Sequence, residues 1–194
     1  MADFMQSDNF LNETYLAEIQ KFFEENVFWS YGWQSSQGNI PLAHWNHDFV
    51  KTKKSNQQDC SSALKENPDL NPLAMLWEML ARDILEGHSL LRCYANAHTF
   101  GIEGFHHTDT LKKGNFTTIF YLNPVWKPEW AGETVFFNSE GEIEKSILPK
   151  PGRMIHFPGN IAHVARGVSR ICPAMRVTLM FKSRAPNAEI DIEI

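Results

Sequence analysis

Two histidines and one aspartate in this chain are spaced so that they could share a metal ion. His107 and Asp109 lie two residues apart, so a β-strand at this point would present both side chains on one face. His163 follows 54 residues after Asp109 (163 minus 109). Two imidazoles and one carboxylate on one side of an ion form the facial triad that suits Fe(II) and leaves coordination positions open. The pattern therefore predicts metal-dependent chemistry rather than a closed structural metal site.

An arginine in an otherwise apolar segment indicates a second site, for an anion. Arg176 lies in the run 175–181, where hydrophobic side chains predominate. A buried guanidinium is unfavourable unless it is paired with an anion, and arginine can hold a carboxylate through two parallel hydrogen bonds. On a strand, Thr178 shares the face of Arg176 and could add a hydroxyl group. The alternative interpretation is a structural salt bridge between Arg176 and an acidic residue elsewhere.

The other six histidines show no spacing that requires a metal. His106 adjoins His107, but strand alternation places it on the opposite face from Asp109, so we assign it no ligand role. The rest are interpreted as ordinary surface or partly buried residues: His44, His47, His88, His98 and His156.

Length and composition are those of a globular protein. A chain of 194 residues with 43% hydrophobic and 21% charged residues can form one domain with a substantial core. The net charge of −5 and the shortness of the one basic cluster, at 51–54, argue against a nucleic-acid partner. The three cysteines are an odd number and widely spaced, which favours a reducing compartment over a disulfide framework.

The sequence also gives no reason to expect a membrane partner. Its first residues lack a basic stretch followed by an apolar one, and no apolar run approaches the length needed to cross a bilayer. We therefore expect a cytoplasmic protein.

Two helices and two short strands are predicted for the first part of the chain, residues 1–88. Asn12 can cap a helix that runs to about residue 25, with one apolar stripe. Asn71 and Pro72 open a second helix, which Gly87 can close. Residues 27–33 and 43–50 are predicted strands, and the polar stretch 51–70 is predicted to be a long loop that orders over the substrate.

Strand signals dominate the remainder. Short β-prone runs separated by glycine and proline turns are typical of a sandwich or jelly roll. We expect a single domain over 1–194, with a helical part at 1–88 and a jelly-roll core at 89–184. The predicted strands are 90–94, 101–109, 116–122, 132–138, 143–148, 153–157, 163–168 and 175–182.

From about residue 90 to 184 the chain resembles the 2-oxoglutarate and Fe(II)-dependent dioxygenases, most closely their prolyl 4-hydroxylase-like branch. The combination covers about half of the chain and is more specific than any one element. One departure is the loop between His163 and Arg176, which is a few residues longer than in prolyl hydroxylases. The matching pieces, in order, are Arg92-Cys93-Tyr94, Gly104 to Asp109, Ile119 to Asn123, Trp126 and Trp130, Gly132 to Phe136, Pro151 to Pro158, His163-Val164 and Arg176-Val177-Thr178.

The resemblance implies a fold, a set of cofactors and a role for each matching residue. The fold would be a double-stranded β-helix, a cupin-like jelly roll that is mainly β with flanking helices. His107, Asp109 and His163 would bind Fe(II), and Arg176, helped by Thr178, would hold the distal carboxylate of 2-oxoglutarate. Tyr121 would line the 2-oxoglutarate pocket, and Tyr94 would be a second cofactor-binding tyrosine on a neighbouring strand. The cosubstrates would be 2-oxoglutarate and O₂, with ascorbate supporting activity.

The substrate is left open by the sequence. Resemblance favours a proline within a peptide or protein, and a free amino acid or other small metabolite is the alternative. A different class is a non-catalytic jelly-roll protein that binds a metal for structure or sensing. The spacing of the cysteines does not support a closed structural zinc site, so the enzyme is preferred.

Overall fold

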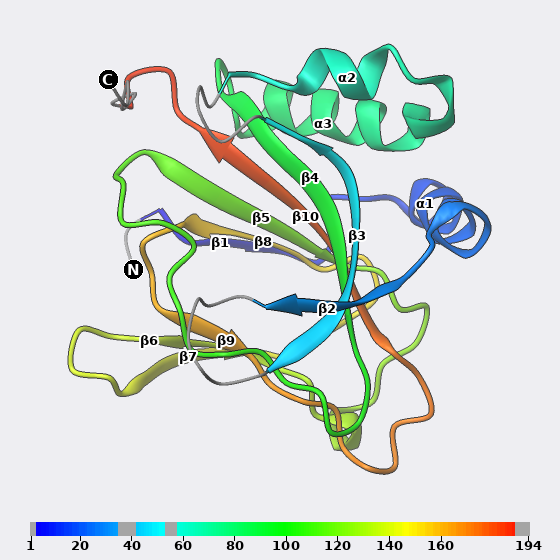
Figure 1. Ribbon diagram of the computed structural model, residues 1–194, viewed down its shortest axis with the longest axis vertical. Coiled ribbons are helices and arrows are strands. Elements are labelled where there is room, and N and C mark those ends of the chain that lie inside the picture. The colour runs from blue at the N-terminus through cyan, green and yellow to red at the C-terminus, as the bar shows by residue number, and fades with distance from the viewer. Residues whose placement is uncertain (1–2, 35–41, 53–57, 189–194) are drawn as a thin grey trace.

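The computed structural model describes residues 3–34, 42–52 and 58–188. These residues form two antiparallel sheets and three helices (Figure 1). The helices are α1 (Glu13–Asn26), α2 (Ser61–Lys65) and α3 (Asn71–Asp83), with short 3-10 turns η1 (Pro68–Leu70) and η2 (Pro128–Trp130). The strands are β1 (Met5–Ser7), β2 (Ser30–Gln34), β3 (Ala43–Lys51), β4 (Ser89–His98), β5 (Asn115–Tyr121), β6 (Thr134–Phe137), β7 (Ile143–Ile147), β8 (Met154–Pro158), β9 (His163–Ala165) and β10 (Arg176–Arg184).

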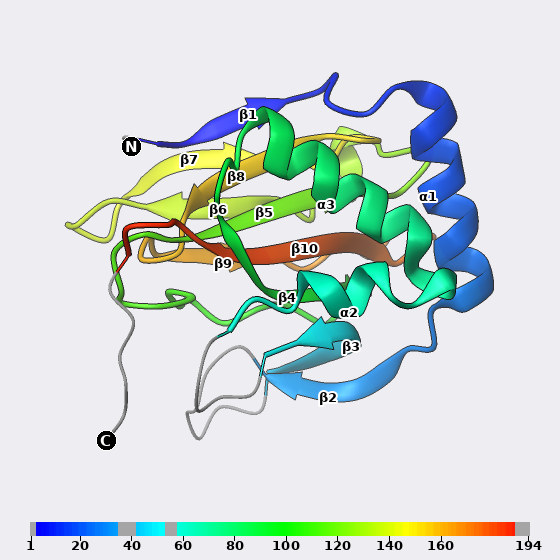
Figure 2. The same cartoon turned by 90° about the horizontal axis from the view of Figure 1, so that it is seen from above.

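A seven-stranded sheet is the largest element of the fold. Its strand order is β1-β8-β5-β10-β4-β3-β2, and a three-stranded sheet, β7-β6-β9, faces it. Every paired strand is antiparallel to its neighbour. The three helices cover the other face of the large sheet (Figures 1 and 2). The expected jelly roll with flanking helices is confirmed. In the first 88 residues the predicted strands at 27–33 and 43–50 appear as β2 and β3, and the short strand β1 was not predicted; all three join the large sheet.

Both predicted helices form, and the details of the second differ. Asn12 caps α1, its side chain accepting a hydrogen bond of 2.8 Å from the Tyr15 backbone N–H. The predicted cap of α3 is wrong: Asn71 is already helical, because the turn η1 runs directly into the helix. Asn67 supplies the capping side chain one turn earlier, accepting from the Asp69 N–H.

The prediction of a loop over 51–70 is also wrong in its second half, where 61–65 and 68–70 are helical. Residues 61–65 form α2, and Leu64 is fully buried among the helices. Leu64 and Leu70 are the two large apolar residues in this polar stretch, which is a weak signal, so the sequence alone did not reveal this packing. The described part of the segment contributes nothing to the lining of the main cavity, and residues 53–57 lie outside the described residues.

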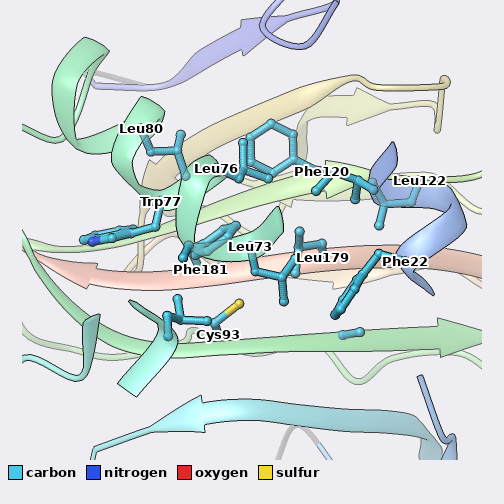
Figure 3. Close-up of a cluster of buried hydrophobic side chains, with 14 of the residues drawn as sticks. Phe22, Leu73, Leu76, Trp77, Leu80, Cys93, Phe120, Leu122, Leu179 and Phe181 are labelled. Atoms are coloured by element: carbon cyan, nitrogen blue, oxygen red, sulfur yellow. The ribbon is translucent and has the colours of Figure 1, made fainter. Parts of the chain in front are cut away.

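Alternation along β10 separates the core of the protein from its cavity. Leu179 and Phe181 point toward the helices and pack with residues of α1 and α3 (Figure 3). Arg176, Thr178 and Lys182, which occupy the alternate positions, line the cavity on the opposite face. Packing of the helix-facing side chains of β10 therefore fixes the position of its cavity-facing side chains.

The helix-side core predicts a matched pair of stability effects. Leu73 on α3 is fully buried, whereas Met75 on the same helix is 46% exposed. Leu73→Ala is expected to lower the free energy of unfolding by about 2–5 kcal/mol, because it leaves a cavity beneath the sheet. Met75→Ala should change it by about 0.5 kcal/mol or less. Urea denaturation followed by tryptophan fluorescence measures both, and equal losses would contradict this assignment of the core.

Candidate active site

A cavity of about 310 Å³ lies between the two sheets, on the face of the large sheet opposite the helices. Strands β2, β3, β4, β5 and β10 contribute one wall, and β6, β9 and the segment before β5 contribute most of the rest. His107, Asp109 and His163 line this cavity, and so does Arg176. Residues far apart in the sequence therefore meet in one enclosed space.

The three predicted metal ligands converge. One possible ligand atom from each of His107, Asp109 and His163 lies within 4.8 Å of the other two. The Nε2 atom of His107 lies 3.5 Å from Oδ1 of Asp109, and Nε2 of His163 lies 3.7 Å from Oδ2. The two imidazole rings have centroids 4.5 Å apart. Among the described residues this is the one group of three or more such side chains close enough to share a cation.

Backbone carbonyls orient both imidazoles. Nδ1 of His107 lies 2.6 Å from the Phe105 carbonyl oxygen, and Nδ1 of His163 lies 2.9 Å from that of Ile161. A carbonyl only accepts hydrogen bonds, so Nδ1 carries the proton and the Nε2 lone pair faces the cavity. Burial lowers the pKa of His163 to about 4, although Asp109 opposes the shift, so this imidazole is neutral at neutral pH. The donor set and its orientation fit Fe(II).

Backbone pairing, rather than a regular strand, places His107 and Asp109. The predicted strand over 101–109 is wrong, because the segment is a loop with a single bridge from His107 to His163. The N–H of His107 donates to the His163 carbonyl at 3.0 Å, and the N–H of Asp109 donates to the Gly159 carbonyl at 2.8 Å. His106 lies away from the three candidate ligands, as expected, because it is exposed and its ring packs edge-on against Phe137.

Two further side chains bind the carboxylate of Asp109, and sequence reasoning missed both. The Thr117 hydroxyl donates to Oδ2 at 2.6 Å, and the Lys182 ammonium forms an ion pair with the same oxygen. Burial disfavours the charged carboxylate, but Lys182 and His163 outweigh it and hold the pKa of Asp109 well below its usual range. The sequence did contain a signal for Lys182, because it lies six residues after Arg176, on the same face of an otherwise apolar strand.

Arg176 is buried without an acidic partner. Its Nε donates to the Gly132 carbonyl at 2.6 Å and its Nη2 donates to the Thr134 hydroxyl at 2.8 Å. Among the described residues, no carboxylate lies within 4.0 Å of this guanidinium, so the alternative of a structural salt bridge is not supported. A buried cation held only by neutral oxygens is suited to receive an anion from the cavity.

Gly132 permits the close approach of this arginine. It adopts a φ of +81°, and a Cβ at this position would lie 3.2 Å from Cδ of Arg176. A larger residue would strain the backbone and crowd the guanidinium stem.

The three other predicted cofactor-binding residues have different positions. Thr178 and Tyr94 line the cavity. Tyr121 is fully buried and is not among the lining residues; its hydroxyl lies 2.6 Å from that of Thr134 and its ring centroid lies 5.2 Å from Cζ of Arg176. Tyr121 therefore supports Thr134 and Arg176 from behind the cavity wall.

Two histidines interpreted as ordinary are deeply buried in this structure. His44 and His98 are stacked with ring centroids 4.8 Å apart, and both lie at the end of the cavity near Arg176. Burial lowers the pKa of His44 to about 4, against an opposing effect of Asn96, and it lowers the pKa of His98 well below its usual range. Both imidazole rings are therefore neutral at neutral pH, and the positive charge at this end of the cavity comes from Arg176.

Comparison with known proteins gives one family match. Residues 91–181, which include all seven predicted site residues, match the family model described as the 2OG-Fe(II) oxygenase superfamily. No curated protein matches the chain by sequence. In the part of the chain that the structure describes, no helix is long and apolar enough to cross a membrane.

Several solved structures share the fold over nearly the whole chain. A prolyl-4-hydroxylase from Pseudomonas putida is 15% identical, with 94% of this chain and 92% of that chain covered and a TM-score of 0.63. A prolyl hydroxylase from Trichoplax adhaerens, in complex with a hypoxia inducible factor peptide fragment, is 15% identical with 95% and 84% covered and a TM-score of 0.66. A 2OG-Fe(II) oxygenase family oxidoreductase from Burkholderia pseudomallei is 13% identical, with 96% and 89% covered and a TM-score of 0.71. At these identities the likeness establishes the fold.

Proposed function

We propose that this 2-oxoglutarate-dependent dioxygenase, whose residues 91–181 match the 2OG-Fe(II) oxygenase family model, hydroxylates a proline residue within a peptide or protein. In this proposal His107, Asp109 and His163 bind Fe(II), and Arg176 binds the distal carboxylate of 2-oxoglutarate. The observation that carries the assignment is that the triad and an arginine without an acidic partner open into one cavity. The match of residues 91–181 to an oxygenase family model supports an enzyme over the alternative of a non-catalytic binding protein.

The cosubstrates supply the oxidation. With Fe(II) bound, one oxygen atom of O₂ enters the substrate as a hydroxyl group and the other enters succinate, as 2-oxoglutarate loses CO₂. The protein supplies two fixed ends for the ketoacid, the triad at one and Arg176 at the other. Because both ends lie in one sheltered cavity, the ketoacid has one orientation, and its charges are met by protein groups rather than by water.

An aromatic and guanidinium wall beside the cavity supports a proline-containing substrate. Cζ of Arg92 lies 4.3 Å from the ring centroid of Trp33 and 3.9 Å from that of Tyr94. Asp48 accepts a hydrogen bond of 2.7 Å from Nε of Arg92, which holds the guanidinium between the two rings. Flat aromatic surfaces are what proline rings pack against in peptide-binding grooves. All three wall residues line the cavity that contains the triad.

A glycine directs Trp33 into this wall. Tyr31 pairs with Trp45 and Trp33 pairs with His44, so an irregularity in the register falls at Gly32. Gly32 has a φ of +125°, a conformation that other residues rarely adopt. The extra residue turns Tyr31 toward Trp45, with ring centroids 5.1 Å apart, while Trp33 faces Arg92.

One observation favours a small polar metabolite as a second candidate substrate. Asn46 and Asn96 are both buried and hydrogen-bonded to each other at 3.1 Å, and Asn96 lines the cavity beside Thr178. A polar inner wall of this kind suits an amino or hydroxyl group on a small molecule that enters the cavity completely.

A substrate screen distinguishes the two candidates. The enzyme is incubated with Fe(II), 2-oxoglutarate and ascorbate and with either proline-containing peptides or free amino acids, and products are read by mass spectrometry. We expect a gain of about 16 mass units on peptides, from insertion of one oxygen atom. The same peptides with alanine in place of proline, and the Asp109→Ala enzyme, should show no gain. A gain confined to free amino acids would reject the peptide substrate while retaining the oxygenase.

A further inference from the structure

The two carboxylate oxygens of Asp109 are in different environments. Oδ2 is bound by the Thr117 hydroxyl and the Lys182 ammonium and lies 3.7 Å from Nε2 of His163, whereas Oδ1 lies 3.5 Å from Nε2 of His107. Thr117 in turn accepts a hydrogen bond of 2.9 Å from Lys182, so the three groups form a closed triangle. The side chains of Asp109 and Lys182 are only 11% and 17% exposed, so water competes weakly for these bonds.

Lys182 reaches Asp109 from the strand that also carries Arg176. The apolar side chains of β10 hold the strand against the helices, so its cavity-facing residues have little freedom to withdraw. Charge-assisted hydrogen bonds to a carboxylate are about twice as strong as neutral ones. Together, Thr117 and Lys182 compete with a metal ion for the lone pairs of Oδ2, so Oδ1 is the oxygen more available as a ligand.

We infer that Lys182 is a positioning residue that makes Asp109 coordinate the metal through one oxygen. As a result, Lys182 lowers the affinity of the site for the metal and raises its affinity for 2-oxoglutarate. This inference rests on the ligand assignment under Proposed function. A carboxylate that coordinated through both oxygens would occupy one of the positions that the ketoacid and O₂ need. By occupying Oδ2, Lys182 keeps that position available.

The charge of Lys182 acts in the same direction as its hydrogen bond. An ammonium beside Asp109 repels a divalent cation and competes with it for the carboxylate, and both effects weaken metal binding. The same positive charge favours the dianion 2-oxoglutarate. Removing the ammonium should therefore strengthen metal binding and weaken ketoacid binding, a pair of opposite shifts that general damage to the site would not produce.

Binding measurements without turnover test this inference. Mn(II) serves as the metal, with its affinity measured from the electron paramagnetic resonance signal of the free ion, and 2-oxoglutarate affinity is measured by calorimetry at saturating Mn(II). For Lys182→Met we expect Mn(II) to bind about tenfold more tightly and 2-oxoglutarate about tenfold more weakly, the scale of one charged contact. Lys182→Gln removes the charge with less change of shape and should shift both affinities in the same directions.

Two control variants define the outcome. Lys150→Met removes an exposed lysine that pairs with Asp8 outside the cavity, and it should change neither affinity. His107→Ala tests the ligand assignment itself, because undiminished Mn(II) binding would reject that assignment. If His107→Ala loses Mn(II) but the Lys182 variants lose both affinities together, or change neither by more than about threefold, the role inferred for Lys182 is wrong.

Discussion

Asp109→Ala and His107→Ala are each expected to abolish 2-oxoglutarate turnover, with a loss of about a thousandfold or more. The reason is geometric: the two imidazoles and the carboxylate lie on one side of a shared position, and two remaining ligands hold Fe(II) weakly. Asp109→Ala also leaves the Lys182 ammonium without its carboxylate partner inside the cavity, which adds positive charge where the metal must bind. Succinate release in the presence of Fe(II) and ascorbate measures the loss.

His106→Ala is the matched control for these variants. His106 adjoins His107 in the sequence, but it is exposed and its ring contacts Phe137. Turnover should therefore be close to that of the unmodified enzyme. Retained turnover in both Asp109→Ala and His107→Ala would reject the triad as the iron site.

Arg176→Met is expected to weaken 2-oxoglutarate binding by about 2–5 kcal/mol, the scale for removing one partner of a buried charge pair. Arg176 donates hydrogen bonds to neutral oxygens, among them the Gly132 carbonyl and the Thr134 hydroxyl, so its positive charge is available to the distal carboxylate. In the variant that carboxylate would be buried beside an apolar side chain. Calorimetric titration of the Mn(II)-loaded protein measures the change, and Mn(II) affinity itself should be unaltered.

Arg170→Met is the control for Arg176. Arg170 lies in the loop between His163 and Arg176 and is exposed, so its replacement should leave 2-oxoglutarate affinity unchanged. The assignment of Arg176 would fail if its own variant bound 2-oxoglutarate as tightly as the unmodified protein, or if Arg170→Met produced the larger loss.

Local pattern was a sound guide to the elements with strong periodicity. The apolar stripe of α1, the strand that becomes β5 and the mixed strand β10 all lie where the sequence predicts them. It was a poor guide to 101–109, which lacks a regular strand, and to 61–70, which is largely helical. In these segments single long-range contacts decide the conformation, as when Leu64 packs among the helices.

The identities and order of His107, Asp109, His163 and Arg176 were sufficient to predict the chemistry, because few combinations of side chains suit an open iron site and a carboxylate. What only the tertiary structure decided is which other groups reach them. Lys182 contacts Asp109, 73 positions earlier (182 minus 109), because antiparallel pairing of β5 with β10 sets Lys182 opposite Thr117. Tyr121 lies behind Thr134 because the two sheets face each other. Sequence spacing specifies neighbours along one strand, whereas contacts between strands depend on register and on how the sheets pack.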